Sequence, residues 1–166
     1  NVFRPVNGRP YELRQHLLHI KGAGGFTTLI VPRRKGEEAP AVTQDGEAFK
    51  LAMPGGTVRL SADGYSYAGA DKAVATAFGA AAVAAEGLSI EGGPTEVVHD
   101  KKAGTITVTA HGPGGKRLFG VPEGKWQAQD KALVWDAAAK KWALDYAGGK
   151  TGEAKPVTAV FQESKP

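Results

Sequence analysis

Apolar and polar residues alternate along much of the chain in short runs that are separated by turns rich in glycine. Thr105–Ala110 alternates threonine with isoleucine, valine and alanine, and Val157–Gln162 shows the same period of two. Successive side chains of a β-strand point to opposite faces of a sheet, so this period is typical of a strand with one buried face. The pattern therefore predicts short strands over most of the chain.

Turn chemistry divides these runs into hairpins. Asp45-Gly46, Pro54-Gly55-Gly56 and Asp63-Gly64 each separate two runs of strand-forming residues. Asp-Gly between alternating segments favours a tight hairpin, because both residues tolerate the positive φ that such a turn requires. Besides the two runs above, we expect strands at Tyr11–Lys21, Phe26–Val31, Ala41–Thr43, Ala48–Leu51, Thr57–Leu60, Tyr65–Tyr67, Leu88–Ile90, Glu96–His99, Lys116–Val121, Leu133–Trp135 and Trp142–Tyr146.

The segment Asp71–Glu86 supports two interpretations. Its many alanines favour a helix, and Val74, Phe78 and Ala81 have helical spacing. Val74, Thr76 and Phe78 also alternate with alanines, however, and Gly79 interrupts the run. We favour two short strands over one helix in this segment.

Short strands that recur about every 8–12 residues with turn residues between them predict a sandwich or barrel. The expected fold is all-β, an antiparallel β-sandwich of short strands with hairpin connections. Its 166 residues fit one domain, so we interpret 1–166 as a single sandwich domain. Because the chain starts at Asn1 without methionine and shows no signal peptide, we interpret it as a fragment or module of a larger chain.

The composition of the chain argues against several kinds of site and partner. The chain has no cysteine, which excludes disulfides, thiolate metal sites and cysteine nucleophiles. The formal net charge is +4, but lysine and arginine are dispersed, whereas a nucleic-acid binder gathers them on one stripe. We therefore expect no nucleic-acid partner, although the charge suits another acidic polymer. No run approaches the roughly 20 apolar residues of a membrane span, so none is expected.

No self-sufficient catalytic motif is present. His16 and His19 lie on opposite faces of one expected strand and cannot chelate one metal together. The glycine-rich run before Lys116 lacks the serine or threonine of a phosphate-binding loop, since Arg117 follows. Asp100 and Asp136, like other aspartates here, occupy turn positions, where the carboxylate serves backbone hydrogen bonds. We expect no catalytic residue, no metal and no cofactor in these residues.

Aromatic residues are the remaining candidates for ligand contact. Tyr65 and Tyr67 point to the same face of one expected strand, and Trp126 follows Gly124-Lys125 in a stretch with the character of an exposed loop. Flat aromatic faces can stack on sugar rings. Trp135 and Trp142 flank an expected hairpin, which favours a cross-strand pair in the core.

The N-terminal part resembles a known family. Arg14–Lys21, followed by Phe26–Gly36 with its Thr28-Leu29-Ile30 and Pro32, resembles the tail of heparinase II/III-like polysaccharide lyases. The short strands in Gly46–Leu60 and Gly87–Gly92 resemble the family's β-rich region. The resemblance implies a helical toroid followed by antiparallel sheet domains, and β-elimination of uronic-acid-containing glycans by tyrosine and histidine. This chain has no run of long helices, so it would correspond to the C-terminal β-sandwich region. No catalytic position of the family is matched here.

We therefore expect a non-catalytic β-sandwich module of a secreted or periplasmic polysaccharide lyase. Its partners would be an anionic polysaccharide and the catalytic domain of the same protein. The main alternative is a stand-alone module that binds carbohydrate or protein without enzyme activity. A purely structural or adhesive domain and an independent enzyme are further alternatives. The candidate ligand contacts are Arg14, His16, Arg59, Tyr65, Tyr67 and Trp126.

Overall fold

The computed structural model describes residue 36 and residues 38–79, 82–147 and 157–163. The chain divides into two compact units, Asn1–Glu37 and Glu38–Pro166, and the fold below is that of the second. The strands expected at Tyr11–Lys21 and Phe26–Val31 lie outside the described residues. The assignment of 1–166 to a single domain stays a prediction.

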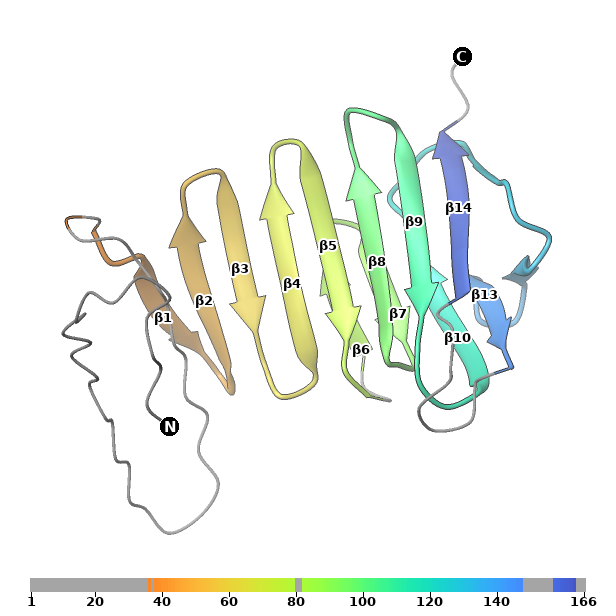
Figure 1. Cartoon of the computed structure of the whole chain (residues 1–166), viewed down its shortest axis with the longest axis horizontal. Helices are drawn as coiled ribbons and strands as arrows, with labels where there is room; N and C mark the ends of the chain where they lie inside the picture. The colour runs from red at the N-terminus through yellow and green to blue at the C-terminus, as the bar shows by residue number, and fades with distance from the viewer. Residues whose placement is uncertain (1–35, 37, 80–81, 148–156, 164–166) are drawn as a thin grey trace, which may run out of the picture. The chain divides into compact units, whose positions relative to one another are not determined.

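The described residues form fourteen strands and no helix (Figure 1). The first seven are β1 (Ala41–Asp45), β2 (Ala48–Met53), β3 (Gly56–Leu60), β4 (Gly64–Gly69), β5 (Lys72–Ala77), β6 (Ala82–Ala85) and β7 (Leu88–Glu91). The others are β8 (Thr95–Asp100), β9 (Thr105–Ala110), β10 (Gly115–Gly120), β11 (Trp126–Ala128), β12 (Leu133–Asp136), β13 (Lys141–Tyr146) and β14 (Val157–Glu163).

The strands make two antiparallel sheets. The first has the order β1-β2-β3-β4-β5-β8-β9-β14-β11, and the second has the order β12-β13-β10-β7-β6. The predicted all-β class with short hairpin-connected strands in a sandwich is confirmed. The preferred interpretation of Asp71–Glu86 is confirmed as well, since β5 and β6 occupy it. Alternation outweighed the helix propensity of alanine there because the alanines of β5 are buried between the sheets.

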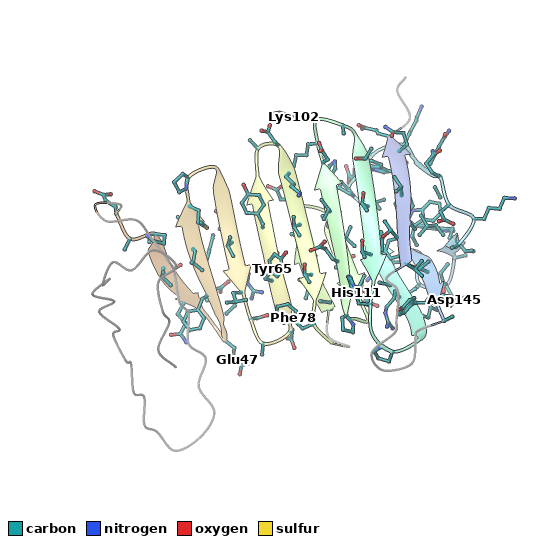
Figure 2. The ribbon with its side chains drawn as sticks, in the orientation of Figure 1. Glu47, Tyr65, Phe78, Lys102, His111 and Asp145 are labelled. Atoms are coloured by element: carbon teal, nitrogen blue, oxygen red, sulfur yellow. The ribbon has the colours of Figure 1, made fainter. Side chains whose placement is uncertain are left out.

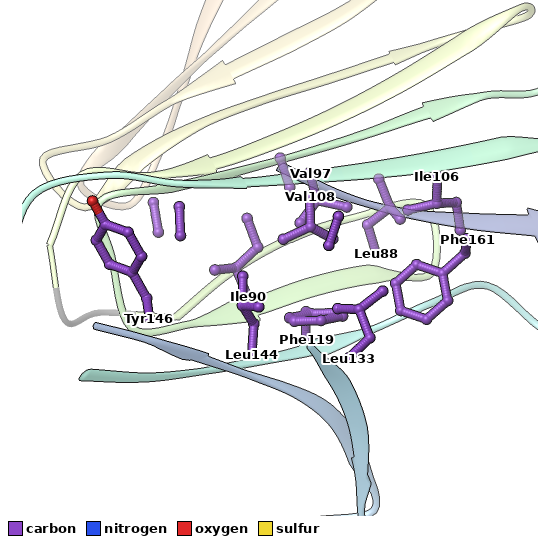
Figure 3. Close-up of a cluster of buried hydrophobic side chains, with 14 of the residues drawn as sticks. Leu88, Ile90, Val97, Ile106, Val108, Phe119, Leu133, Leu144, Tyr146 and Phe161 are labelled. Carbon is purple, nitrogen blue, oxygen red and sulfur yellow. The ribbon is translucent and has the colours of Figure 1, made fainter. Parts of the chain in front are cut away.

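The hydrophobic core lies between the two sheets (Figure 3). From the first sheet, every second residue of β5, β8, β9 and β14 points inward; from the second sheet, β7, β10 and β13 do the same. The rings of Phe119 and Phe161 meet edge to face, with centroids 5.7 Å apart. The largest side chains that are fully buried are Phe119, Phe161, Leu88, Ile90, Ile106, Leu144, Val97 and Val108.

The first sheet continues beyond the second. β6 is the outermost strand of the second sheet, and it packs against β4 and β5 (Figure 1). β1, β2 and β3 extend the first sheet past β6, and every residue of β1 is exposed. We call β1–β3 the ledge. The two sheets therefore form a step where β6 ends and the ledge begins.

Candidate functional site

Strand register assigns each candidate side chain to one of the two faces of the first sheet. Ser66 of β4 pairs with the fully buried Ala75 of β5, so it lies on the inner face, toward the second sheet. Arg59 pairs with Ser66 and shares that inner face. Tyr65 and Tyr67 alternate with Ser66 and therefore lie on the outer face. The predicted common face of the two tyrosines is confirmed.

The ring of Tyr67 lies flat along the outer face. Gly56 and Gly69 are cross-strand partners, and a Cβ added at Gly56 would come within 2.7 Å of the Tyr67 ring. A Cβ added at Gly69 would come within 2.8 Å of the ring's Cζ. The hydroxyl donates a hydrogen bond to the Gly55 carbonyl at 3.0 Å. Two glycines thus seat one side of the ring against the backbone, and the side chain as a whole is half-buried.

Tyr65 contacts both a carboxylate and an exposed aromatic ring. Its hydroxyl lies 3.3 Å from Oε2 of Glu96, to which Thr76 also donates at 3.4 Å. Its ring centroid is 6.3 Å from that of Phe78, which is 48% exposed. Figure 2 shows Tyr65 and Phe78 near the same end of the first sheet. We call Tyr65, Tyr67, Thr76, Phe78 and Glu96 the tyrosine face.

The tyrosine face combines ring surfaces with hydrogen-bonding groups, and it holds one carboxylate and no cation. Such a surface suits a ligand that presents both C–H faces and hydroxyls, as a sugar ring does. It offers no acid–base pair aimed at a common point, and its carboxylate already accepts two hydrogen bonds. The arrangement can contact a ligand through ring faces and hydrogen bonds.

Arg59 does not lie on the tyrosine face but beside a cavity on the inner face of the first sheet. A cavity of about 300 Å³ lies at the step, bordered by the ledge, the β3–β4 turn and β6. Arg59 borders it, and its Nε is 3.5 Å from Oδ2 of Asp45, with both side chains more than half exposed. Tyr65 also borders the cavity, but its side chain leaves toward the outer face. The structure thus separates Arg59 from the two tyrosines, with which we had grouped it.

The interpretation of Trp126 as an exposed loop residue is wrong. Trp126 begins β11, is half-buried and packs against the core. Its Nε1 donates to the Pro122 carbonyl at 3.0 Å, and its ring meets that of His99 edge to face at 5.4 Å. Burial, reinforced by Lys101, lowers the pKa of His99 below its ordinary range. Trp126 therefore has a packing role. The sequence did not indicate a strand here because β11, with three residues, is too short to show a period of two.

Trp135 and Trp142 form the expected cross-strand pair. They are direct partners of β12 and β13, with ring centroids 5.6 Å apart. Trp142 also contacts the buried Phe161 at 5.0 Å, whereas Trp135 is 52% exposed. The pairing is confirmed, but only Trp142 reaches the core, because β12 is the last strand of its sheet.

The turn role of the acidic residues is confirmed at two sites. Oδ1 of Asp100 accepts hydrogen bonds from the N–H groups of Lys102 and Ala103 at 3.0 and 2.8 Å. Oδ1 of Asp136 accepts one from the N–H of Ala139 at 2.9 Å. Within the described residues, no three histidine, aspartate or glutamate side chains gather as a metal site. Arg14 and His16 lie outside the described residues.

Comparison with known proteins adds no relative: no family model, curated protein or solved structure was found to match the chain. In the part of the chain that the structure describes, no helix is long and apolar enough to cross a membrane. The structure thus defines the protein as an all-β sandwich whose first sheet carries an aromatic outer face.

Proposed function

We propose that this domain is a non-catalytic β-sandwich module that contacts a glycan through the tyrosine face. The observation that carries the proposal is the flat seating of Tyr67 on Gly56 and Gly69. A ring held in this way is already ordered, so stacking a ligand on it costs little additional side-chain entropy. Tyr65, Thr76 and Glu96 lie beside it as donors and acceptors for sugar hydroxyls.

The parent protein is proposed to be a secreted or periplasmic polysaccharide lyase acting on uronic-acid-containing glycans. The resemblance of Arg14–Lys21 and Phe26–Gly36 to the heparinase II/III-like tail supports this assignment. The formal net charge of +4 favours approach to an anionic chain over long range. In this proposal the module buttresses the catalytic domain of the same protein and extends its glycan surface, while the chemistry belongs to that domain.

Titration of the domain with oligosaccharides tests the glycan contact. We would record two-dimensional NMR spectra of the full chain with uronate-containing and with neutral oligosaccharides of equal length. The proposal expects shift changes at Tyr65, Tyr67 and Phe78. A response confined to other residues, or no response to either series at millimolar concentration, contradicts it.

Variants of Tyr67 separate stacking from hydrogen bonding. Tyr67→Leu removes the ring and should weaken binding about tenfold, because a lost aromatic contact costs roughly 0.5–1.5 kcal/mol beyond its buried area. Tyr67→Phe keeps the ring and should bind almost as well as the parent. Trp135→Leu removes an aromatic side chain that is 52% exposed on the other sheet and serves as the control. Equal loss in the Trp135 and Tyr67 variants contradicts a specific role for the tyrosine face.

A further inference from the structure

The step between β6 and the ledge lies on the opposite side of the first sheet from the tyrosine face. We propose that an extended peptide segment of a partner protein binds there as an added strand beside β6, with a carboxylate of the peptide on Arg59. This proposal is independent of the glycan contact. It rests on the edge of β6 that no described strand covers, the small side chains below it and the charges of the ledge.

β6 directs backbone groups into the step. It is joined to β7 by the two-residue turn Glu86-Gly87, whose φ values are 45° and 81°. In a hairpin of this type the closing pair, here Ala85 and Leu88, exchanges hydrogen bonds, and every second residue does the same. Ala82 and Ala84 therefore point their N–H and C=O groups away from β7. Within the described residues, neither has a backbone hydrogen bond on that side.

The sequence of β6 offers no protection to this edge. Proteins usually block an exposed strand edge with a charged side chain, a proline or a bulge. β6 reads Ala-Val-Ala-Ala and pairs with β7 without interruption, and Ala82 and Ala84 are exposed. An edge that lacks these features, and whose outward backbone groups have no partner among the described residues, is the kind of site that strand addition uses.

The floor of the step has room for a strand. The cavity of about 300 Å³ is bordered by Ala82, Val83 and Ala84 on one side. Its floor on the first sheet consists of small residues: Ala48, Ser61, Ala62, Gly64 and Ser66. Packed sheets lie about 10 Å apart. Ala48 and Gly64 are already covered, whereas Ser61, Ala62 and Ser66 keep exposed surface, so the inward side chains of an added strand would lie over these three.

The charges of the ledge favour a peptide with one acidic side chain. Arg59 and Lys50 are cross-strand partners on the inner face, and both are exposed. The contact of Arg59 with Asp45 is long and solvent-exposed, so it contributes little and leaves the guanidinium available. Glu47 and Asp63 border the same cavity at the strand ends and disfavour a second carboxylate there. The partner strand is thus short, with small inward residues and one glutamate or aspartate over Arg59.

Blocked octapeptides provide the probe. We would use three that alternate threonine with alanine and carry glutamate, glutamine or lysine at one central position. Amide hydrogen exchange of the full chain is followed by NMR. Strand addition predicts at least tenfold slower exchange at the amides of Ala82 and Ala84 with the glutamate peptide. It also predicts that the glutamate peptide binds about threefold more tightly than the glutamine peptide, a preference that Arg59→Gln abolishes.

A proline at position 84 tests the backbone contact directly. Ala84→Pro removes an outward N–H and leaves the ladder to β7 intact, since proline is tolerated on strand edges. It should weaken peptide binding about tenfold, whereas Ala84→Thr keeps the N–H and should bind normally. Unchanged binding by a folded proline variant overturns the proposal. If circular dichroism shows that this variant does not fold, the exchange of the Ala82 and Ala84 amides in the parent protein decides.

Amide hydrogen exchange measured without peptide shows whether something other than a partner peptide occupies the step. Slow exchange of the Ala82 and Ala84 amides that does not depend on protein concentration would indicate a segment of the same chain in the step. Slow exchange that appears only at high concentration would indicate a second copy. Either result overturns the partner-peptide proposal. Tyr67→Leu should leave peptide binding unchanged, so failure of the glycan contact and failure of the strand addition are separable.

Discussion

Replacing Phe161 tests whether the two sheets pack as described. Phe161 of β14 has no exposed surface, and its ring lies edge to face against Phe119 at 5.7 Å and Trp142 at 5.0 Å. Phenylalanine-to-alanine changes in a core cost about 3–5 kcal/mol. Because Phe161 makes two aromatic contacts, we expect Phe161→Ala to lower the free energy of unfolding by about 4 kcal/mol. The total stability of a domain is about 5–15 kcal/mol. The variant should fold but be strongly destabilised.

Phe161→Leu divides this loss into its parts. Leucine restores most of the buried apolar volume, so the remaining cost, about 1–2 kcal/mol, reflects the lost aromatic contacts and the changed shape. Urea denaturation followed by tryptophan fluorescence gives the free energy of unfolding, because Trp142 touches the site. Val160→Ala, on the outer side of the same strand, is the control. A cost below about 1.5 kcal/mol for Phe161→Ala would refute the packing argument.

Two further predictions, one substitution and one pH dependence, have defined outcomes. Gly64→Ala places a Cβ 2.0 Å from the Thr76 carbonyl oxygen and 2.8 Å from Cγ2 of Val83, so it should cost about 1–3 kcal/mol by thermal denaturation. Burial and Lys101 lower the pKa of His99, so the unfolded chain binds the proton more readily. The contribution of His99 to stability should therefore be constant above pH of about 6.5 and decline as the pH falls from there toward the lowered pKa.

Controls for both predictions are available in the same chain. Gly46 has no atom within 4 Å of an added Cβ but has a positive φ of 61°, so Gly46→Ala measures backbone strain without a clash. If Gly64→Ala costs no more than Gly46→Ala, the close approach of the sheets at Gly64 is not as described. His99→Gln should flatten the pH dependence of stability between about 5 and 7. An unchanged slope in that variant assigns the effect to other groups.

Local pattern predicted most of the described strands, because the side-chain period and the turn residues are local properties. It predicted that Tyr65 and Tyr67 share a face, which depends only on their spacing of two. It did not show that Arg59 lies on the opposite face, because that depends on the register of β3 against β4. It missed β11, since three residues are too few for a recognisable alternation.

The local sequence pattern could not predict the order of the strands in the two sheets. The two sheets differ in width, and this difference creates the step beside β6. Nothing in the alternation of Ala82–Ala85 reveals that one side of the strand has a neighbour and the other has none. Backbone hydrogen bonding between distant strands decides that, and backbone groups are the same at every position.

The place of β14 in the first sheet has a consequence for how the protein folds. β14 is the last strand in the described chain, yet it lies between β9 and β11, and its partners in β9 are residues 105–110. The meander β1–β5 and the hairpin β8–β9 need only neighbouring segments and can form early, whereas the pairing of β9 with β14 needs a contact distant in sequence. During synthesis, β9 therefore keeps an open edge until residues 157–163 have left the ribosome. Closure by β14 is the step at which we expect folding to be slowest and most open to mispairing.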